Sequence, residues 1–504
     1  MSACAEVVRY FANYQGYLAR SAISKVEIEQ LIDSGVSAEE LAQRIIDRME
    51  QLEGLRLGYQ AVGETKIPVI LPDDLRDKHI YVIGKSGYGK TNFLRYLISQ
   101  DLRAGNGIGV LAPEYEMLRD EILPAIPESR IKDVIYFNPA DTEKPVVLNP
   151  LHLDPDDDLD LQVDETFTIL QRVVGEGGPR MDEILRYSLY ALTERQGSSL
   201  LDIETLLDRS DSSLRDEVID TTEDELTRKF FKHTYPQLPK DSHLPIINRL
   251  GRFVRARYVR NCLCPPQRTT LSPAEVSKRM LSIRRAMDQG KILLFNLSDG
   301  ILGEAASSLI GQFVISKFQT ATMSRADESK QHRQPFYLYL DEFQNFCGTA
   351  SQSYERILSR ARKYRLGLIL AHQQTGQLPT ELIREIFGNV STMISFQVSQ
   401  PDALKVSREF VFQHDFDVDS IAAEELLRLG VGQAYCKIGR SVFPFSIPRV
   451  EDRFDHKRAE VVINHSRDNH GIPREMIDQT ETERFAREQG DDPLADIDPG
   501  AVFE

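Results

Sequence analysis

The 504-residue sequence predicts an α/β fold, namely a doubly wound parallel sheet with an all-helical insertion and a small helical N-terminal region. Three observations lead to this prediction. Short apolar runs typical of buried strands alternate with helical stretches, as they do in parallel sheets. One of these runs passes straight through a glycine-rich loop into a helix. A long internal block, in contrast, has almost no strand pattern.

The N-terminal region, residues 1–66, is predicted to be helical. Its segment SGVSAEELAQRIIDRMEQLEG offers Ser37 and Glu40 as a capping box and ends at Gly54. The first residues are too polar for a signal peptide, and no apolar run approaches the roughly 18 residues of a membrane helix. Five cysteines without a C-x-x-C pair indicate a reducing compartment. We therefore expect a cytoplasmic protein with no membrane span of its own.

The sheet is predicted to come from residues 67–158 and 286–450. Between them, residues 159–285 are expected to form the helical insertion, because segments such as MDEILRYSLYALTE (181–194) place apolar residues at helical spacing. Residues 451–504 are expected to form a C-terminal extension with an acidic, disordered tail. Strand-like runs lie at 79–83, 107–113, 132–139, 291–297, 336–342, 366–373, 391–398 and 432–438.

The first strand-like run leads into a phosphate-binding pattern. In HIYVIGKSGYGKTNFLRYLI (79–98), Gly84, Gly89, Lys90 and Thr91 form G-x-x-x-x-G-K-T, the P-loop. Glycines let backbone N–H groups curl around an anion, and the helix start adds the positive end of its dipole. We predict that Lys90 reaches the β- and γ-phosphates of ATP and that the Thr91 hydroxyl ligates Mg²⁺; a glycine-rich turn before a structural helix is the alternative. The predicted nucleotide-binding residues are Gly84, Lys85, Ser86, Gly87, Tyr88, Gly89, Lys90, Thr91 and Asn92.

A second apolar strand runs directly into two acids, in FYLYLDEFQNF. In a P-loop ATPase the first acid, here Asp341, holds Mg²⁺, and the second, Glu342, can act as the general base for the attacking water. A strand that merely ends in two solvated acids is common, so the prediction depends on the P-loop upstream. The adjacent acids favour a motor ATPase over a GTPase-like switch.

A third buried strand, LGLILAHQQTGQL, ends at His372, Gln373 and Gln374. Ligands of parallel sheets lie beyond the carboxyl ends of the strands, so this end is expected to meet the P-loop and the two acids at one edge. The Gln373 amide could then sense the γ-phosphate through the catalytic water. Ordinary polarity at a strand end is the alternative.

The most basic stretch of the predicted core, YERILSRARKYRLG, lies between these two motifs. A solvated helix face would explain its charge. A sharper interpretation is that one arginine reaches the nucleotide of a neighbouring subunit as an arginine finger, while others face DNA phosphates. The basic residues are Arg356, Arg360, Arg362, Lys363 and Arg365.

The net charge of −16 does not exclude DNA as a partner. Residues 154–165 carry seven acids and no base, and residues 451–504 carry fifteen acids and seven bases. These segments contribute −7 and −8, which is −15 of the total. The rest of the chain is near neutral and can carry a local basic path.

Several stretches together resemble a known family. YLDEFQNF, ILSRARKYRLGLILAHQ and FGNVSTMISFQV are similar to the HerA/FtsK group of ring ATPases that pump DNA, and within it to conjugative coupling proteins of the TraD/TraG type. KDVIYFNPADTEKPVVLNPL and residues 282–313 support the resemblance, which covers roughly residues 76–470. It implies a RecA-like P-loop sheet. One departure is Ala112, which stands where relatives often carry an acid before the proline.

By position, the resemblance assigns roles to the motifs. It implies the phosphate and Mg²⁺ roles of Lys90 and Thr91, the metal role of Asp341, the general base Glu342 and the γ-phosphate sensor Gln373. Arg362 matches the trans-acting arginine best, Arg360 is the second choice and Arg180 the third. Arg356, Lys363, Arg365 and the loop CGTASQS are the expected DNA contacts.

The expected function is an ATP- and Mg²⁺-dependent motor that forms a ring, as a homohexamer, and translocates DNA through its centre. A nuclease or a secretion channel is the expected further partner. Two alternatives stay open: a coupling ATPase that delivers DNA or DNA-linked protein to a secretion channel, and a protein-remodelling ATPase. A nucleotide-gated scaffold is disfavoured, because it has no need of a general base.

Overall fold

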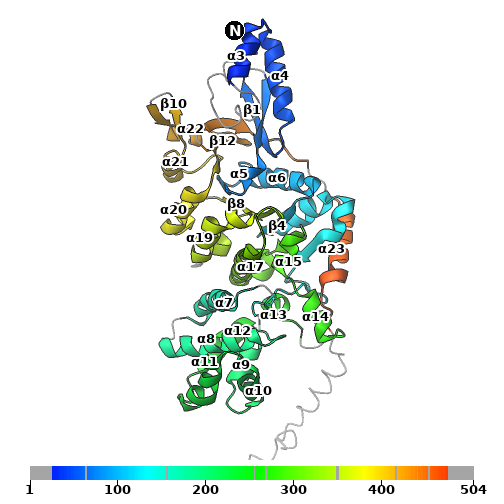
Figure 1. Ribbon diagram of the computed structural model, residues 1–504, viewed down its shortest axis with the longest axis vertical. Helices are drawn as coiled ribbons and strands as arrows, with labels where there is room; N and C mark the ends of the chain where they lie inside the picture. Colours follow the sequence, from blue (N-terminus) through cyan, green and yellow to red (C-terminus); the bar gives the residue numbers. More distant parts are fainter. Residues whose placement is uncertain are drawn as a thin grey trace, which may run out of the picture.

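An eleven-stranded sheet forms the centre of the described part of the chain (Figure 1). The computed structural model describes residues 25–62, 65–154, 157–175, 178–254, 256–266, 269–347, 351–414, 417–439, 441–451 and 454–474. Its parallel strands are, in order across the sheet, β9 (Thr392–Ser395), β3 (Ile80–Ile83), β8 (Leu366–His372), β7 (Phe336–Leu340), β4 (Gly107–Ala112), β6 (Ile292–Asn296) and β5 (Val134–Phe137). The α/β fold class is confirmed, and each of these strands was expected from the sequence.

The sheet continues beyond β9 with four antiparallel strands. These are β12 (Gln433–Ile438), β13 (Ser441–Ser446), β1 (Leu55–Val62) and β2 (Thr65–Leu71). The prediction that residues 1–66 are helical is therefore wrong for its last part, where β1 and the start of β2 complete this side of the sheet. The expected 432–438 strand exists, but it runs antiparallel.

From residue 25, where the described part of the chain begins, two helices precede these strands, α3 (Lys25–Asp33) and α4 (Ala38–Glu50). Ser37 caps α4, because its side chain accepts a hydrogen bond from the Glu40 N–H at 3.2 Å. Leu41 and Met49 are buried together with Leu55 and Ile67 of the first two strands. The helical pair thus packs on the antiparallel end of the sheet (Figure 1).

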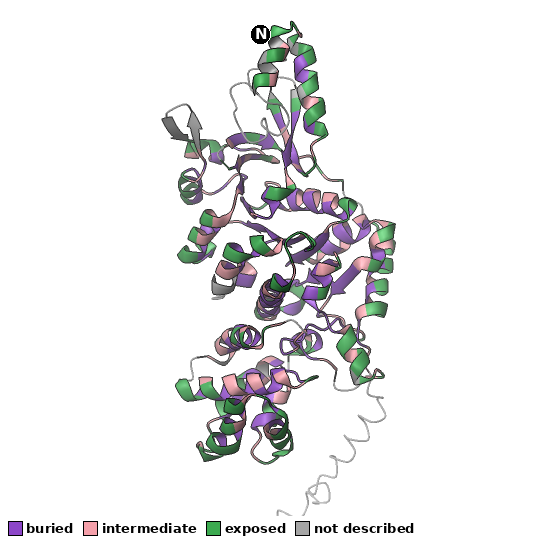
Figure 2. Ribbon diagram, in the orientation of Figure 1, coloured by how far each residue is buried: buried purple, intermediate pink, exposed green. Residues whose placement is uncertain are grey.

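Both faces of the parallel strands are buried, as a doubly wound sheet requires. In β3, Ile80 and Val82 join one apolar cluster while Tyr81 and Ile83 join the other. Figure 2 shows buried residues along the strands and on the inner faces of the helices. The core helices are α5 (Asp73–Arg76), α6 (Lys90–Ala104), α15 (Ile283–Asp288), α16 (Asp299–Leu302), α17 (Glu304–Ser324), α18 (Gln344–Cys347), α19 (Ser351–Arg360), α20 (Thr380–Asn389), α21 (Gln400–Val406) and α22 (Ala423–Leu427), and a small hairpin pairs β10 (Val411–His414) with β11 (Asp417–Ser420).

The described residues between 159 and 285 contain helices and no strand. They form a lobe at one end of the molecule, opposite α3 and α4 (Figure 1). The lobe is joined to the core through α7, which packs against α17. Its helices are α7 (Leu159–Val174), α8 (Pro179–Glu194), α9 (Asp202–Leu207), α10 (Ser213–Thr221), α11 (Glu225–Lys229), α12 (Leu244–Val254), α13 (Arg257–Leu263) and α14 (Pro273–Arg279).

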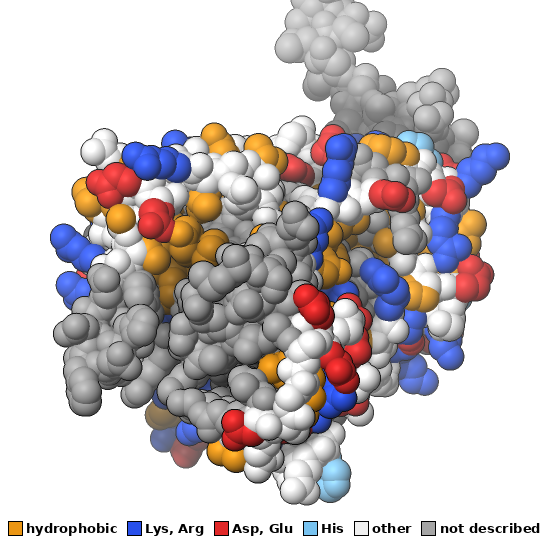
Figure 3. All heavy atoms as spheres, turned by 90° about the horizontal axis from the view of Figure 1, so that it is seen from above, with side chains coloured by type: hydrophobic (Ala, Val, Ile, Leu, Met, Phe, Trp, Pro, Cys, Tyr) orange, Lys and Arg blue, Asp and Glu red, His pale blue; other side chains and the backbone are white. Residues whose placement is uncertain are grey.

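The last described helix, α23 (His456–His470), packs at the opposite edge of the sheet, beside β5. There the Tyr136 N–H donates to Ser466 Oγ at 2.8 Å. The acidic tail expected to be disordered, at the end of the 451–504 extension, lies outside the described residues, which end at residue 474. Among the helices that are described, none combines the length and apolar character that crossing a bilayer requires. Basic and acidic side chains are interspersed on the end of the molecule seen in Figure 3.

Candidate nucleotide site

The three sequence motifs meet at one edge of the sheet. β3, β8 and β7 are neighbours and parallel, so the P-loop, Gln373 and the Asp341–Glu342 pair all follow adjacent carboxyl ends. The Gly84 N–H donates to the His372 carbonyl at 3.3 Å, and this bond joins the start of the P-loop to the end of β8. Residues 250 positions apart in the sequence thus share one site.

Two glycines of the P-loop are required by its geometry. Gly89 has a φ of +114° where α6 begins, a conformation that side chains disfavour. A Cβ on Gly84 would lie 2.5 Å from Phe396 Cβ. Lys85 donates its N–H to the Gln397 carbonyl at 2.7 Å, which fixes the start of the loop. Ser86 and Gly87 form its exposed tip.

Lys90 is the buried cation of the site. Its side chain is 4 % exposed, and Nζ lies 3.4 Å from the Lys85 carbonyl and 3.8 Å from Glu342 Oε1. A buried ammonium needs a counter-charge, which Glu342 supplies within this chain. The phosphates of a nucleotide are a stronger counter-charge of the same kind.

Thr91 and Asp341 offer a hydroxyl and a carboxylate to one point. Thr91 Oγ1 donates to Asp341 Oδ2 at 3.3 Å. Burial raises the pKa of Asp341 to about 7, as do the charges of Glu342 and Glu114, against the opposing effect of Lys90. A carboxylate with so little compensation for its charge fits a divalent cation, and hard oxygen donors are those that Mg²⁺ prefers. Asp341 and Thr91 would hold it, and the ion would neutralise charge on the phosphates.

Glu342 is held on both of its oxygens. Oε1 accepts from Gln373 Nε2 and Oε2 accepts from Gln344 Nε2, each at 2.8 Å. Its backbone has a φ of +46°, which is rare for a residue with a side chain and is found at functional sites. Gln344, two residues further along the sequence, was not singled out from the sequence. Its position in DEFQNF was the available signal.

Gln373 and His372 have different environments. Gln373 faces Glu342, whereas His372 is buried beside Phe343, with Nε2 2.5 Å from the Tyr81 hydroxyl. Burial lowers the pKa of His372 to about 3, so the ring is neutral at physiological pH. The loop that follows is fixed by Asp402, which accepts from the Thr375 N–H at 3.0 Å and from its hydroxyl at 2.6 Å.

Two further features of the site, Glu114 and the segment after β13, were not predicted from the sequence. Glu114 follows β4, next to β7, and its charge contributes to the raised pKa of Asp341. Glu114 thus places an acid directly after the proline, whereas the position before the proline, where relatives often carry the acid, holds Ala112. The segment after β13 also reaches the site. There the Asn92 amide donates to the Pro448 carbonyl and accepts from the Val450 N–H, each at 3.0 Å. The Asn92 side chain is thus engaged by the protein itself.

The basic segment lies at the other end of the strands. The basic segment immediately precedes β8, whereas Gln373 follows β8. The seven residues of this strand therefore separate the segment from Gln373 by roughly 20 Å. Arg360 and Arg362 are exposed there. Arg180 lies elsewhere, on α8 of the insertion, where it lines a groove with Phe167 and Tyr190.

The three predicted DNA contacts differ in how far they are engaged. Arg356 Nη1 pairs with Glu165 of α7 at 2.8 Å. Arg365 donates to the Arg333 carbonyl at 3.4 Å and is half-buried. Lys363 is exposed. The loop CGTASQS lies partly outside the described residues.

Comparison with protein families agrees with this geometry. Residues 55–298 match the central domain of helicase HerA, and residues 335–414 match the TraM recognition site of TraD and TraG. The chain belongs to the HerA/FtsK superfamily of P-loop ATPases. It is accordingly an ATP hydrolase. Between them the two matches contain the P-loop, Asp341, Glu342 and Gln373.

Solved structures give this HerA/FtsK chain the same fold. The plasmid coupling protein TrwB, bound to a non-hydrolysable GTP analogue, is 15 % identical with a TM-score of 0.53, covering 81 % of this chain and 93 % of TrwB. A TrwB complex with ADP and Mg²⁺ matches at the same identity and TM-score, covering 81 % and 92 %. VirB4 of Thermoanaerobacter pseudethanolicus is 14 % identical with a TM-score of 0.52, covering 81 % and 98 %. No curated protein sequence matches the chain significantly.

Proposed function

We propose that this chain is a ring-forming motor, a homohexamer, that couples Mg-ATP hydrolysis to movement of DNA through a central channel. The observation that carries the proposal is the contact of Gln373 with Glu342 at 2.8 Å beside Lys90. A water that contacts this joined amide and carboxylate at the γ-phosphate would be in position for in-line attack. The relation to coupling proteins and to VirB4 supports an ATPase of conjugation or secretion.

The residues of the site receive distinct roles in this proposal. Lys90 and the P-loop N–H groups bind the phosphates, and Thr91 with Asp341 holds Mg²⁺. Glu342 accepts the proton of the attacking water. Gln373 orients that water, and its hydrogen bond to Glu342 keeps both groups aligned. Gln344 holds the second oxygen of Glu342 and limits its rotation.

The arginine segment supports the ring. Arg360 and Arg362 lie roughly 20 Å from the nucleotide edge of their own subunit, so neither can touch that nucleotide. A cation that stabilises the transition state from this position serves a neighbour's site. Hydrolysis then depends on how adjacent subunits sit, which is what a sequentially firing ring requires. Arg362 is the first choice for this finger, Arg360 the second and Arg180 the third.

DNA contacts are expected from the exposed part of the same segment. Lys363 is the best placed of the predicted residues, with Arg365 second. Arg356 ranks last, since its guanidinium already compensates a carboxylate that is almost fully buried, Glu165. The boundaries of the core, the insertion and the terminal regions are proposed as in the sequence analysis, with β1 and β2 added to the core.

A second candidate is a coupling ATPase that delivers DNA or DNA-linked protein to a secretion channel. The match of residues 335–414 to TraD and TraG favours it, because that family model is named for recognition of a partner protein.

The four described cysteines are free and buried thiols, which supports a reducing compartment such as the cytoplasm.

The choice of polymer that stimulates hydrolysis tests the function. ATP turnover of the full chain is measured with duplex DNA, single-stranded DNA and an unfolded protein, each at equal mass. The proposal predicts stimulation by DNA and none by the protein. Stimulation by the unfolded protein alone would replace the DNA motor with a protein-remodelling ATPase.

A further inference from the structure

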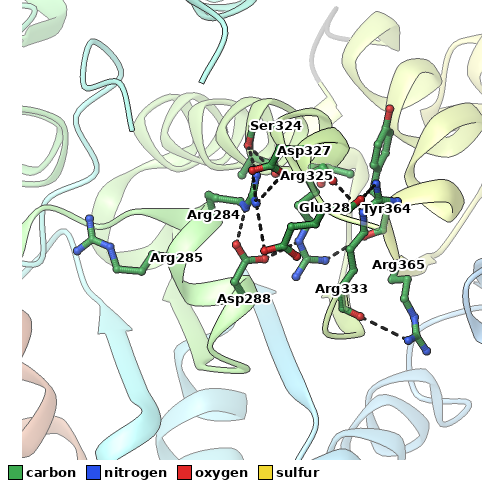
Figure 4. A network of polar contacts seen from close by, with 12 residues as sticks. Arg284, Arg285, Asp288, Ser324, Arg325, Asp327, Glu328, Arg333, Tyr364 and Arg365 are labelled. Atoms are coloured by element: carbon green, nitrogen blue, oxygen red, sulfur yellow. Dashed lines mark hydrogen bonds and ion pairs between the residues drawn. The ribbon is translucent and has the colours of Figure 1, made fainter. Parts of the chain in front are cut away.

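Two buried arginines, Arg325 and Arg333, bind the main chain of the basic segment from the interior of the protein (Figure 4). The segment forms a 3-10 turn, η7 (Ala361–Tyr364), between α19 and β8. Arg325 and Arg333 lie on either side of a short loop that follows α17. The two side chains point at the carbonyls of η7 and not at solvent.

Arg325 is the more buried of the two, with no exposed surface. Its Nη1 donates to the Tyr364 carbonyl at 2.9 Å, and its Nε pairs with Asp288 at 2.8 Å. Burial lowers the pKa of Arg325, although Asp288 opposes that effect. A guanidinium buried at this cost fixes the position of whatever it binds, because an unsatisfied charge there would destabilise the fold.

Arg333 binds three main-chain carbonyls with one guanidinium, and thereby joins the loop after α17 to η7. Nη1 donates to the Lys363 carbonyl at 2.6 Å, Nε to the Arg325 carbonyl at 2.8 Å, and Nη2 to the Glu328 carbonyl. Its planar group also lies 4.9 Å from the centre of the Tyr364 ring. The Arg333 carbonyl in turn accepts from Arg365. A rigid five-donor fork is suited to such a junction, and lysine cannot reproduce it.

Arg325 and Arg333, which we call the clamp, compensate for an unfavourable local conformation. Arg365 has a φ of +57°, where a non-glycine residue is strained, and three of the five residues from 361 to 365 are cationic. Left alone, such a turn would sample many conformations, and its like charges would repel. Binding its carbonyls from the interior leaves the side chains of Arg360, Arg362 and Lys363 exposed on a fixed backbone.

We propose that Arg325 and Arg333 are positioning residues for the trans arginine. They act through the backbone of η7, so that Arg362, or Arg360, reaches the neighbouring nucleotide in one orientation. This inference rests on the proposed trans role. Arg325 and Arg333, although outside the nucleotide site, thus contribute to the rate of ATP hydrolysis in the neighbouring subunit.

The test replaces Arg333, the less buried of the pair. Arg333→Gln is expected to lower kcat roughly ten- to hundredfold, since small misplacements of a reacting group have effects of this size. KM should stay within about twofold, because the subunit's own P-loop is unchanged. Arg333→Lys keeps the cation in the folded site but loses the fork, and we expect at least a threefold loss. The matched control is Arg284→Gln, which disrupts the same network but contacts Asp288, Asp327 and Ser324 and no carbonyl of η7.

Mixed rings separate positioning from folding. Arg333→Gln protein mixed with Glu342→Gln protein should recover part of its activity, because some interfaces combine an intact clamp with an intact base. In addition, Arg362→Ala/Arg333→Gln should be no slower than Arg362→Ala alone. Arg333→Lys at wild-type kcat, or an equal loss in Arg284→Gln, would overturn the clamp.

The mixtures also separate this inference from the function on which it rests. A second mixture combines Arg362→Ala protein with Glu342→Gln protein. If this mixture recovers activity and the Arg333→Gln mixture does not, the clamp is wrong and the trans arginine stands. If neither recovers in rings shown to be mixed, the trans arginine is wrong and the clamp fails with it.

Discussion

The nucleotide site brings one buried cation, Lys90, together with three acids, so its negative charge is only partly compensated. Lys90 faces Glu342 at 3.8 Å, while Asp341 is buried beside Glu342 and under the influence of Glu114. The sequence predicted Lys90, Asp341 and Glu342, because their motifs are local. It did not predict Gln344 or Glu114, which matter only through the neighbours that folding gives them. The pairing of Arg356 with Glu165, 191 residues away in the sequence, was beyond any local pattern.

Removal of the general base should separate binding from hydrolysis. Glu342→Gln keeps the shape of the side chain but cannot accept a proton, so kcat should fall about 10²- to 10⁴-fold. ATP affinity should be retained, as measured by calorimetry. Glu114→Gln removes a charge close to Asp341 without touching Gln373, and it is the matched control. A similar loss in both variants would assign the effect to charge and not to proton transfer.

The pKa of Asp341 predicts how the stability of the nucleotide-free chain depends on pH. A carboxyl group whose folded pKa is raised from 3.8 to about 7 stabilises the fold when protonated. That stabilisation is complete below pH 4 and is lost as the pH rises through 7. Asp341→Asn should therefore melt at a higher temperature than wild type at pH 8, with a smaller difference at pH 5. Thermal melts without nucleotide and Mg²⁺ measure this, and equal shifts at both pH values would contradict the buried, uncompensated carboxylate.

Among the structural elements, the strands of the parallel sheet and β12 were predictable, whereas β13, β1 and β2 of the antiparallel extension were not. Buried parallel strands such as 336–340 are continuous apolar runs that stand out in a sequence. β1 and β2 are interrupted by Gly58 and Pro68, and β13 contains Pro444, so each resembles a loop. They become strands because each finds an edge to pair with: β13 pairs with β12, β1 with β13 and β2 with β1. The helical insertion was predicted because its apolar residues keep helical spacing.

One buried ion pair joins three elements of the core and gives a prediction of stability. Arg76 of α5 bonds Asp101 of the P-loop helix α6 at 2.6 Å, and the Tyr339 hydroxyl of β7 donates to the same oxygen at 2.5 Å. Asp101→Ala leaves the buried Arg76 cation with only the exposed Asp73 carboxylate, 3.6 Å from Nη1, as a counter-charge. This should cost about 3–5 kcal/mol of unfolding free energy. Urea titration measures it. Arg76→Met/Asp101→Leu is the control and should be closer to wild type, because it removes both charges. A double variant as unstable as the single one would show that packing, and not charge, is the cause.

At the scale of the whole molecule, nucleic-acid binding should depend on salt and not on sequence. A motor that grips any stretch it passes contacts phosphates, and each contact releases condensed counterions. Lys363→Ala should reduce the slope of log affinity against log salt by about 1. Lys240→Ala, an exposed lysine of the insertion, should leave it unchanged. An affinity that is flat in salt, or confined to one DNA sequence, would contradict the motor.

The central claim is that each active site is completed by a second subunit, and rings mixed from two inactive variants test it most directly. Glu342→Gln subunits supply Arg362 without a base, and Arg362→Ala subunits supply the base without the finger. Each variant alone should bind ATP, assemble and hydrolyse slowly. ATP turnover should partly return on mixing, because some interfaces then hold both groups. A mixture as inactive as its components, in rings shown to contain both variants, would contradict it.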